Sequence, residues 1–210
     1  MSQLISRTNS HIFISGQTRS GKTYFAAKAL KGLPDPVLFI NIQDEQLPGF
    51  QRIMVDQVEY SQLEEVLKHG EKIDLRFPAN YPLKVINKIT GYILDQLMTA
   101  GFSQNRPIYV AVDECHTLEG AGLDSAIQVA TRGLARGVRG VFITQRPALV
   151  SKTLYTQATE HYMFYLSPAE KQYFKEKGFD FELCQKFWTK NGQYSYVYFD
   201  GKDLNGRRAV

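Results

Sequence analysis

Eight residues near the amino terminus constrain the fold more than any other feature of the chain. They read G-x-x-x-x-G-K-T and lie between an apolar run, residues 11–15, and a stretch of helix-forming residues, 24–31. Its two glycines let the backbone curl so that successive N–H groups point inward, and the start of the next helix adds a partial positive charge. A strand, this loop and a helix in that order are typical of a phosphate-binding loop. The motif consists of Gly16, Gln17, Thr18, Arg19, Ser20, Gly21, Lys22 and Thr23.

The phosphate-binding loop predicts roles for two of its side chains. We expect Lys22 to contact the β- and γ-phosphates of ATP, and the Thr23 hydroxyl to ligate Mg²⁺. The alternative is a glycine turn before a helix with a surface lysine. The strand and helix expected on either side of the motif disfavour that alternative.

An acidic pair follows a second apolar run. Residues 108–113 are predicted to form a strand that ends in Asp113, and Glu114 comes next. Because a phosphate-binding loop needs a second magnesium anchor, we expect Asp113 to hold Mg²⁺ through a water and Glu114 to polarise the attacking water. A strand-end turn without chemistry is the alternative. A base at Glu114 favours hydrolysis over phosphoryl transfer to a small molecule.

Strands and helices alternate up to residue 147, which predicts an α/β fold with a mostly parallel central sheet and helices on both faces. Further strands are expected at 37–42, 73–77, 140–144, 160–166 and 193–199. Helices are expected from a capping box at Ser61 and Glu64, from Pro82 to Gly101, over 123–136, and from a second capping box at 167–170.

Gln145 follows the predicted strand 140–144, at the edge of the sheet where ligands bind in such folds. We therefore expect its side chain to orient the attacking water or to sense the γ-phosphate. A buried or turn-forming glutamine stays open as an alternative.

Length and composition suit one domain over residues 1–210, with core motifs in 11–150, further strands and helices in 151–200 and a polar tail, a candidate for disorder, in 201–210. No apolar run is long enough to span a bilayer and no secretion signal is recognisable, so a cytoplasmic protein is expected. The net charge of +4 is compatible with a polyanionic partner but does not identify one.

These motifs, together with Thr144-Gln145-Arg146-Pro147, resemble the FtsK/HerA superfamily of DNA-pumping ATPases. Within it, the chain is most similar to the genome-packaging ATPases of turreted icosahedral archaeal viruses, over roughly residues 11–150. The resemblance implies a RecA-like ATPase that uses ATP and Mg²⁺ and forms a homo-oligomeric, hexameric ring around double-stranded DNA. It implies a viral packaging motor in the host cytoplasm or the virion, with capsid or portal-vertex proteins as further partners.

Three other functions stay open. The first is a cellular HerA-like DNA-processing ATPase, which the lack of room for additional modules disfavours. The second is a small-molecule kinase on the same fold, which would need an arginine-rich lid and an acceptor pocket. The third is a nucleotide-controlled scaffold that completes no motor cycle.

The resemblance also implies an arginine that stabilises charge on the transferring phosphoryl group of a neighbouring subunit. Arg136 is the first candidate, with Arg132, Arg139 and Arg146 as rivals. Arg19 occupies a position where cellular members usually carry glycine; as in large terminase motors, it could serve the nucleotide of its own subunit. Candidate contacts to DNA are Lys152 and a loop over residues 119–124.

Overall fold

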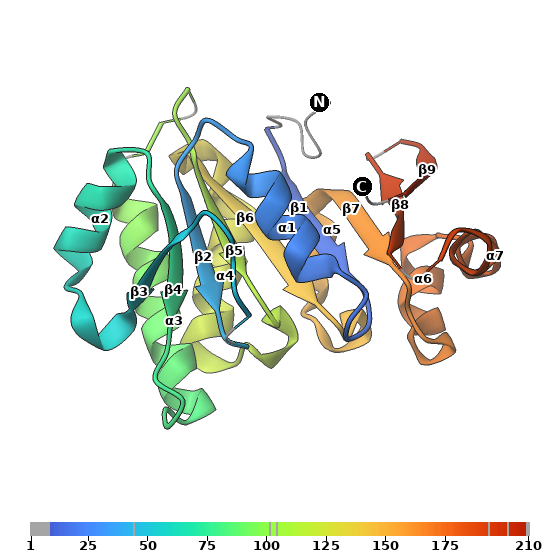
Figure 1. The fold of residues 1–210 in the computed structure, drawn as a ribbon, viewed down its shortest axis with the longest axis horizontal. Helices are drawn as coiled ribbons and strands as arrows, with labels where there is room; N and C mark the ends of the chain where they lie inside the picture. Colours follow the sequence, from blue (N-terminus) through green and yellow to red (C-terminus); the bar gives the residue numbers. More distant parts are fainter. Residues whose placement is uncertain are drawn as a thin grey trace.

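The computed structural model describes residues 9–43, 45–100, 102–103, 105–192, 194–200 and 202–208. Within these residues, nine strands form one sheet in the order β3-β4-β2-β5-β6-β1-β7-β8-β9 (Figure 1). Neighbouring strands from β3 to β7 are parallel, whereas β8 is antiparallel to both β7 and β9. The strands are β1 (His11–Ser15), β2 (Val37–Asn41), β3 (Gln51–Met54), β4 (Lys72–Arg76), β5 (Ile108–Val112), β6 (Val138–Thr144), β7 (Ala158–Phe164), β8 (Ser195–Phe199) and β9 (Leu204–Arg208).

Helices cover both faces of this sheet, but unequally. Helix α1 packs on one face through Phe25, Ala26 and Leu30, and Figure 1 shows it in front of the strands. The other face carries the remaining helices, which share one apolar core with the strands. The expected α/β class, with a mostly parallel sheet, is confirmed. The helices are α1 (Lys22–Lys31), α2 (Tyr60–Lys68), α3 (Leu83–Thr99), α4 (Gly120–Arg132), α5 (Lys152–Gln157), α6 (Lys171–Lys177) and α7 (Phe181–Asn191).

Burial explains why the central strands could be predicted from the sequence. Strands β1, β2, β5 and β6 are buried along their whole length. A parallel strand that is covered on both faces appears as a continuous apolar run, because neither set of alternating side chains meets water. The carboxyl ends of these strands therefore meet at one edge of the sheet, where the phosphate-binding loop follows β1.

Two predicted helices have different boundaries in the structure. Helix α2 begins one residue before Ser61, and its capping box is formed by Glu59 and Gln62, whose Oε1 accepts a hydrogen bond of 3.0 Å from the Glu59 N–H. The predicted helix over 123–136 begins earlier, at Gly120, and ends at Arg132; a 3₁₀ turn, η3 (Leu134–Arg136), follows it. Gly101, the predicted end of the helix from Pro82, lies outside the described residues.

The C-terminal part contains elements that the sequence patterns did not predict. Strand β9 lies within the predicted polar tail, of which residues 201, 209 and 210 are outside the described part. Its sequence, LNGRR, lacks alternating apolar residues, so the sequence does not indicate a strand. The strand is recognised from its backbone pairing with β8. Helix α7 packs Phe181 and Trp188 into the same apolar core as α3 and α4. None of the described helices is long and apolar enough to cross a membrane.

Candidate active site

The loop between β1 and α1 is fixed to the ends of two neighbouring strands. The Gly16 N–H donates a hydrogen bond of 3.1 Å to the carbonyl of Thr144, the last residue of β6, and the Gln17 N–H donates one of 2.8 Å to the Tyr165 carbonyl just after β7. A Cβ atom at Gly16 would lie 2.5 Å from Ser20 Oγ and 2.6 Å from Phe164 Cβ. Glycine is therefore required at the start of the loop for a steric reason.

Strained backbone conformations coincide with two candidate catalytic residues. Among the described residues, the non-glycine residues with positive φ are Arg19, at 64°, and Glu114, at 49°. The left-handed region is unfavourable for side chains of this size, and such outliers cluster at functional sites. Both residues lie at the carboxyl edge of the sheet, one in the loop after β1 and the other directly after β5.

The loop places polar side chains in a buried environment. Lys22 is only 4% exposed, and Thr23 beside it is equally buried in the first turn of α1. The hydroxyl oxygens of Ser15 and Ser20 are buried and have no hydrogen-bond partner in the protein. Buried polar atoms are normally satisfied, so these orphaned groups indicate a place where a polar ligand completes the site.

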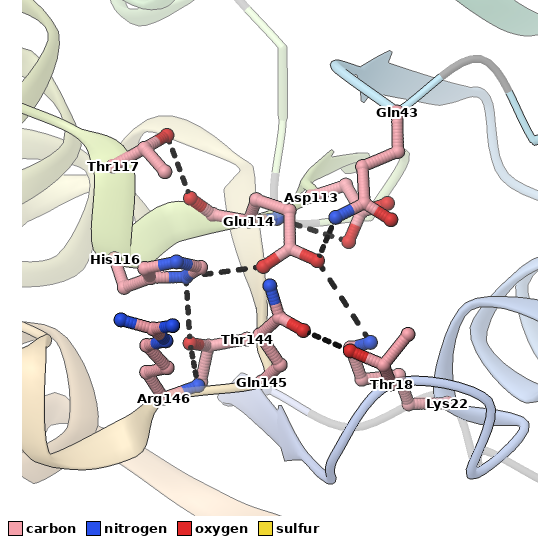
Figure 2. A network of polar contacts seen from close by, with 10 residues as sticks. All are labelled: Thr18, Lys22, Gln43, Asp113, Glu114, His116, Thr117, Thr144, Gln145 and Arg146. Atoms are coloured by element: carbon pink, nitrogen blue, oxygen red, sulfur yellow. Dashed lines mark hydrogen bonds and ion pairs between the residues drawn. The ribbon is translucent and has the colours of Figure 1, made fainter.

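The acidic pair after β5 faces this loop. The Lys22 Nζ atom lies 3.8 Å from Glu114 Oε1, and both side chains are almost completely buried (Figure 2). Strand order explains the approach, because only β6 separates β1 from β5. The structure thus brings the predicted phosphate-binding lysine and the predicted base together, although they are far apart in the sequence.

Asp113 is fully buried, and one of its oxygens lacks a partner. Its Oδ1 accepts a hydrogen bond of 2.9 Å from the Glu114 N–H, whereas Oδ2 has none. Burial, followed by the charge of Glu114, raises the pKa of Asp113 to about 7, against the opposing influence of Lys22. A nearby cation would offset both effects and favour the ionised carboxylate.

These features fit a magnesium site in which the phosphates of a bound nucleotide supply some of the metal ligands. The described residues contain no group of three or more His, Cys, Asp or Glu side chains that could hold a metal by themselves. Mg²⁺ is usually bound by one or two protein oxygen ligands together with waters and substrate phosphates. The Thr23 hydroxyl and the Asp113 Oδ2 atom, which has no hydrogen-bond partner, are the ligands that would hold Mg²⁺ here.

Two residues that the sequence reading missed contact Glu114. Gln43, two residues after β2, donates a short hydrogen bond from Nε2 to Glu114 Oε1. His116, in the 3₁₀ turn η2 (Cys115–Thr117), places Nδ1 3.0 Å from Glu114 Oε2, and Thr144 Oγ1 lies 3.1 Å from the same nitrogen (Figure 2). Their one sequence signal is their position just after strands that end at the ligand-binding edge.

Gln145 also turns toward the loop. Its Oε1 accepts a short hydrogen bond from the Thr18 hydroxyl, so the end of β6 is linked to the middle of the phosphate-binding loop (Figure 2). A cavity of about 560 Å³ lies beside this contact and is lined in part by Gln17, Arg146 and Glu170. Gln145 is therefore placed to respond to a ligand on the loop.

The candidate arginines fall into two groups. Arg19 and Arg146 are exposed at the carboxyl edge of the sheet, close to the loop. Arg136 is exposed before β6, at the opposite edge, and the seven residues of that strand span roughly 20 Å at about 3.3 Å per residue. Arg136 is therefore too far from the loop to contact a ligand bound there by the same chain. Arg139 is a poor rival because it is buried and donates a hydrogen bond of 3.0 Å to the Tyr109 hydroxyl.

The remaining candidates lie in helices. Arg132 ends α4 and is exposed. Most of the expected loop over residues 119–124 is the first turn of α4, since that helix begins at Gly120. Lys152 is exposed at the first position of α5.

Comparisons with known proteins agree with this architecture. No protein-family model and no curated protein sequence matches the chain. Among solved structures, the genome packaging NTPase B204 from Sulfolobus turreted icosahedral virus 2, in complex with AMPPCP, superposes with a TM-score of 0.66 and 13% identity, over 97% of this chain and 100% of B204. The chain has the fold of B204. The resemblance inferred from the motifs is confirmed at the level of the fold.

Two other structures share the fold. The DNA-packaging ATPase B204 from Sulfolobus turreted icosahedral virus matches with a TM-score of 0.62 and 15% identity, over 97% of this chain and 99% of that chain. The pCW3 conjugation coupling protein TcpA matches with a TM-score of 0.58 and 14% identity, over 97% of this chain and 61% of TcpA. At such low identity the activity has to be argued from the site.

Proposed function

We propose that this chain is an ATPase of the FtsK/HerA type that translocates double-stranded DNA, and that it serves as a viral genome-packaging motor. The observation that carries the proposal is the approach of Lys22 to Glu114, 3.8 Å apart in a buried site that includes Asp113. The B204 proteins that share the fold support it, since they are packaging NTPases and one was solved with ATP-γS.

Different residues of the site bind the phosphates, bind the metal and activate the water. The loop N–H groups and Lys22 bind the phosphates of ATP. Thr23 and Asp113 would hold Mg²⁺, which would supply positive charge beside the phosphate oxygens. Glu114 accepts the proton of the attacking water. Its left-handed backbone, with φ at 49°, turns the carboxylate back toward Lys22.

Two polar side chains contact the carboxylate of that base. Gln43 binds one oxygen of Glu114, and the His116 ring lies 3.0 Å from the other. Gln145 is held at the loop by Thr18, where it can sense the γ-phosphate. Gln43, His116 and Gln145 follow different strands or lie in adjoining turns. Loss of the γ-phosphate would therefore change the contacts of several elements at once.

The motor proposal requires a ring of subunits, which we propose is hexameric. DNA would pass through its centre and be gripped by its phosphates, so that binding depends on salt but not on sequence. Arg136 would act on the neighbour's nucleotide, and Arg19 on the nucleotide of its own subunit. As a packaging motor, the ring would work in the host cytoplasm against capsid or portal-vertex proteins.

An ATPase assay with and without double-stranded DNA tests the proposal. We expect DNA of any sequence to stimulate turnover and added salt to remove the stimulation. Lys22→Ala should abolish turnover, while Lys28→Ala, at an exposed position of the same helix, should not. Turnover that needs a small hydroxyl acceptor would indicate a kinase instead. Lack of any DNA effect would contradict the motor and leave a nucleotide-controlled scaffold.

A further inference from the structure

Two exposed tyrosines lie at the start of α1, where the phosphate-binding loop ends. Tyr24, the third residue of the helix, is 59% exposed, and Tyr194, just before β8, is 57% exposed. The Tyr194 ring covers the loop backbone: a Cβ atom at Gly21 would lie 3.1 Å from its Cδ1 and 3.7 Å from its Cε1. An exposed aromatic ring therefore lies directly against the end of the phosphate-binding loop.

Packing around β8 fixes the position of Tyr194. Tyr196, two residues later, packs against Phe25 of α1 with ring centroids 4.9 Å apart and the rings tilted, and Phe164 of β7 lies 5.3 Å from both rings. The turn before β8 is closed by Ser195, whose N–H and hydroxyl donate hydrogen bonds of 3.1 Å and 2.6 Å to the Gly192 carbonyl. The buried residues that follow Tyr194 therefore fix the backbone that carries the exposed ring.

Sheet order shows which part of a nucleotide would meet this ring. Strand β1 lies between β6 and β7, so one flank of the loop faces β6 and β5 and the other faces β7 and β8. Glu114 is on the first flank and lies 3.8 Å from Lys22, so the γ-phosphate belongs there. A bound nucleotide would then extend its base toward the second flank, where Tyr194 lies.

We propose that Tyr194 is the stacking platform for the nucleotide base, an inference that rests on the proposed ATPase function. A flat ring that is more than half exposed can bury one face against a base without displacing any core contact. Every base offers a similar face, so a stacking platform tolerates different bases. The site therefore accepts all four nucleoside triphosphates and binds purine nucleotides more tightly through their larger rings.

Comparing ATP with inorganic tripolyphosphate, both with Mg²⁺, separates the base from the phosphates. Calorimetric titration of Tyr194→Ala should show ATP binding weakened roughly 5- to 100-fold, as for the loss of one base–aromatic stack, with tripolyphosphate binding unchanged. Tyr194→Phe keeps the ring and should bind ATP as the wild type does. Tyr92→Ala is the matched control, because Tyr92 is 55% exposed on α3 at a distance from the loop.

Other outcomes would overturn the platform. If Tyr194→Ala weakens ATP and tripolyphosphate equally, the ring only shapes the loop; if it weakens neither, the base lies elsewhere. If the wild type binds tripolyphosphate as tightly as ATP, the base contributes nothing, while the phosphate-binding loop stands. If the wild type binds neither compound, the ATPase function fails as well.

Discussion

At the scale of single residues, Glu114 combines strain, burial and polar contacts. Its backbone is left-handed, its side chain is buried, and Lys22, Gln43 and His116 surround its carboxylate. A residue with a purely structural role gains little from a strained conformation, which costs roughly 1–2 kcal/mol. The arrangement is better explained by a base that must face a phosphate.

Replacing that base tests its role directly. Glu114→Gln keeps the shape of the side chain but removes its capacity to accept a proton, so ATP should still bind while turnover falls by about 10²- to 10⁴-fold. Steady-state turnover and nucleotide affinity, measured together, give both results. Glu65→Gln, at an exposed position of α2, is the control. Turnover above a tenth of the wild-type rate would exclude Glu114 as the base.

His11, at the amino end of β1, makes a different prediction. Burial, followed by the charge of Arg139, lowers its pKa from 6.5 to about 4, and its Nδ1 accepts a hydrogen bond of 2.9 Å from the Gly140 N–H. Between these two values the unfolded chain binds a proton that the folded chain does not. Stability is therefore lost as the pH falls from 6.5 toward 4, by about 2 kcal/mol between pH 8 and pH 5.

Denaturant unfolding at both pH values measures this loss. His11→Asn supplies an uncharged acceptor in place of Nδ1 and should remove about 2 kcal/mol of the pH dependence. His69→Asn, at an exposed position, should leave it unchanged. An unaltered pH dependence in His11→Asn would show that this histidine titrates normally in the folded protein.

The sequence was informative about residues within motifs and uninformative about their partners. Gly16 to Thr23, Asp113 and Glu114 could be chosen because fixed spacing and flanking apolar runs specify a site. Gln43 and His116 could not, because isolated polar residues become partners of Glu114 only once strands β2, β5 and β6 are side by side. Residues that act through tertiary contacts carry no local signal.

At the scale of elements, the sheet centre and its C-terminal edge differ in predictability. The buried parallel strands are continuous apolar runs, whereas β9 is polar and is formed by pairing with β8. Helix α7 connects this edge to the core. Trp188, the single tryptophan, is buried there and donates a hydrogen bond of 3.1 Å to the Met163 carbonyl of β7.

The start of α7 depends on one cap. Asp180 Oδ1 accepts a hydrogen bond of 3.0 Å from the Leu183 N–H, so Asp180→Ala should lower the free energy of unfolding by about 1 kcal/mol. Trp188 fluorescence during denaturant unfolding reports the change at the helix itself. Asp95→Ala, on the exposed face of α3, should have little effect. Equal losses in both variants would remove the capping role.

In the molecule as a whole, the sheet separates Arg136 from the phosphate-binding loop. Arg136 lies before β6 and the phosphate-binding loop lies after β1, at opposite edges of one sheet. A ring in which one subunit's amino edge faces its neighbour's loop would bring them together. No sequence pattern reveals such an arrangement, because it depends on surfaces that belong to two chains.

Mixing inactive subunits distinguishes the two arginine schemes. If Arg136 acts on a neighbour, Arg136→Ala should lose about 10³- to 10⁵-fold in turnover, and mixing it with Lys22→Ala should restore activity at interfaces that combine one intact group from each. Arg19→Ala mixed with Lys22→Ala should stay inactive. If Arg19 and Lys22 both serve the nucleotide of their own subunit, every site in the mixture still lacks one of the two side chains. Full activity of Arg136→Ala alone would contradict the neighbour scheme.

The central claim is that the loop after β1 and the acids after β5 bind one magnesium triphosphate between them. A crystal structure with Mg²⁺ and a non-hydrolysable ATP analogue measures this directly. We predict phosphate oxygens on Lys22 Nζ, and the cation held by Thr23 and Asp113. A triphosphate bound elsewhere, or one that Lys22 and Asp113 are too far apart to share, would contradict the account.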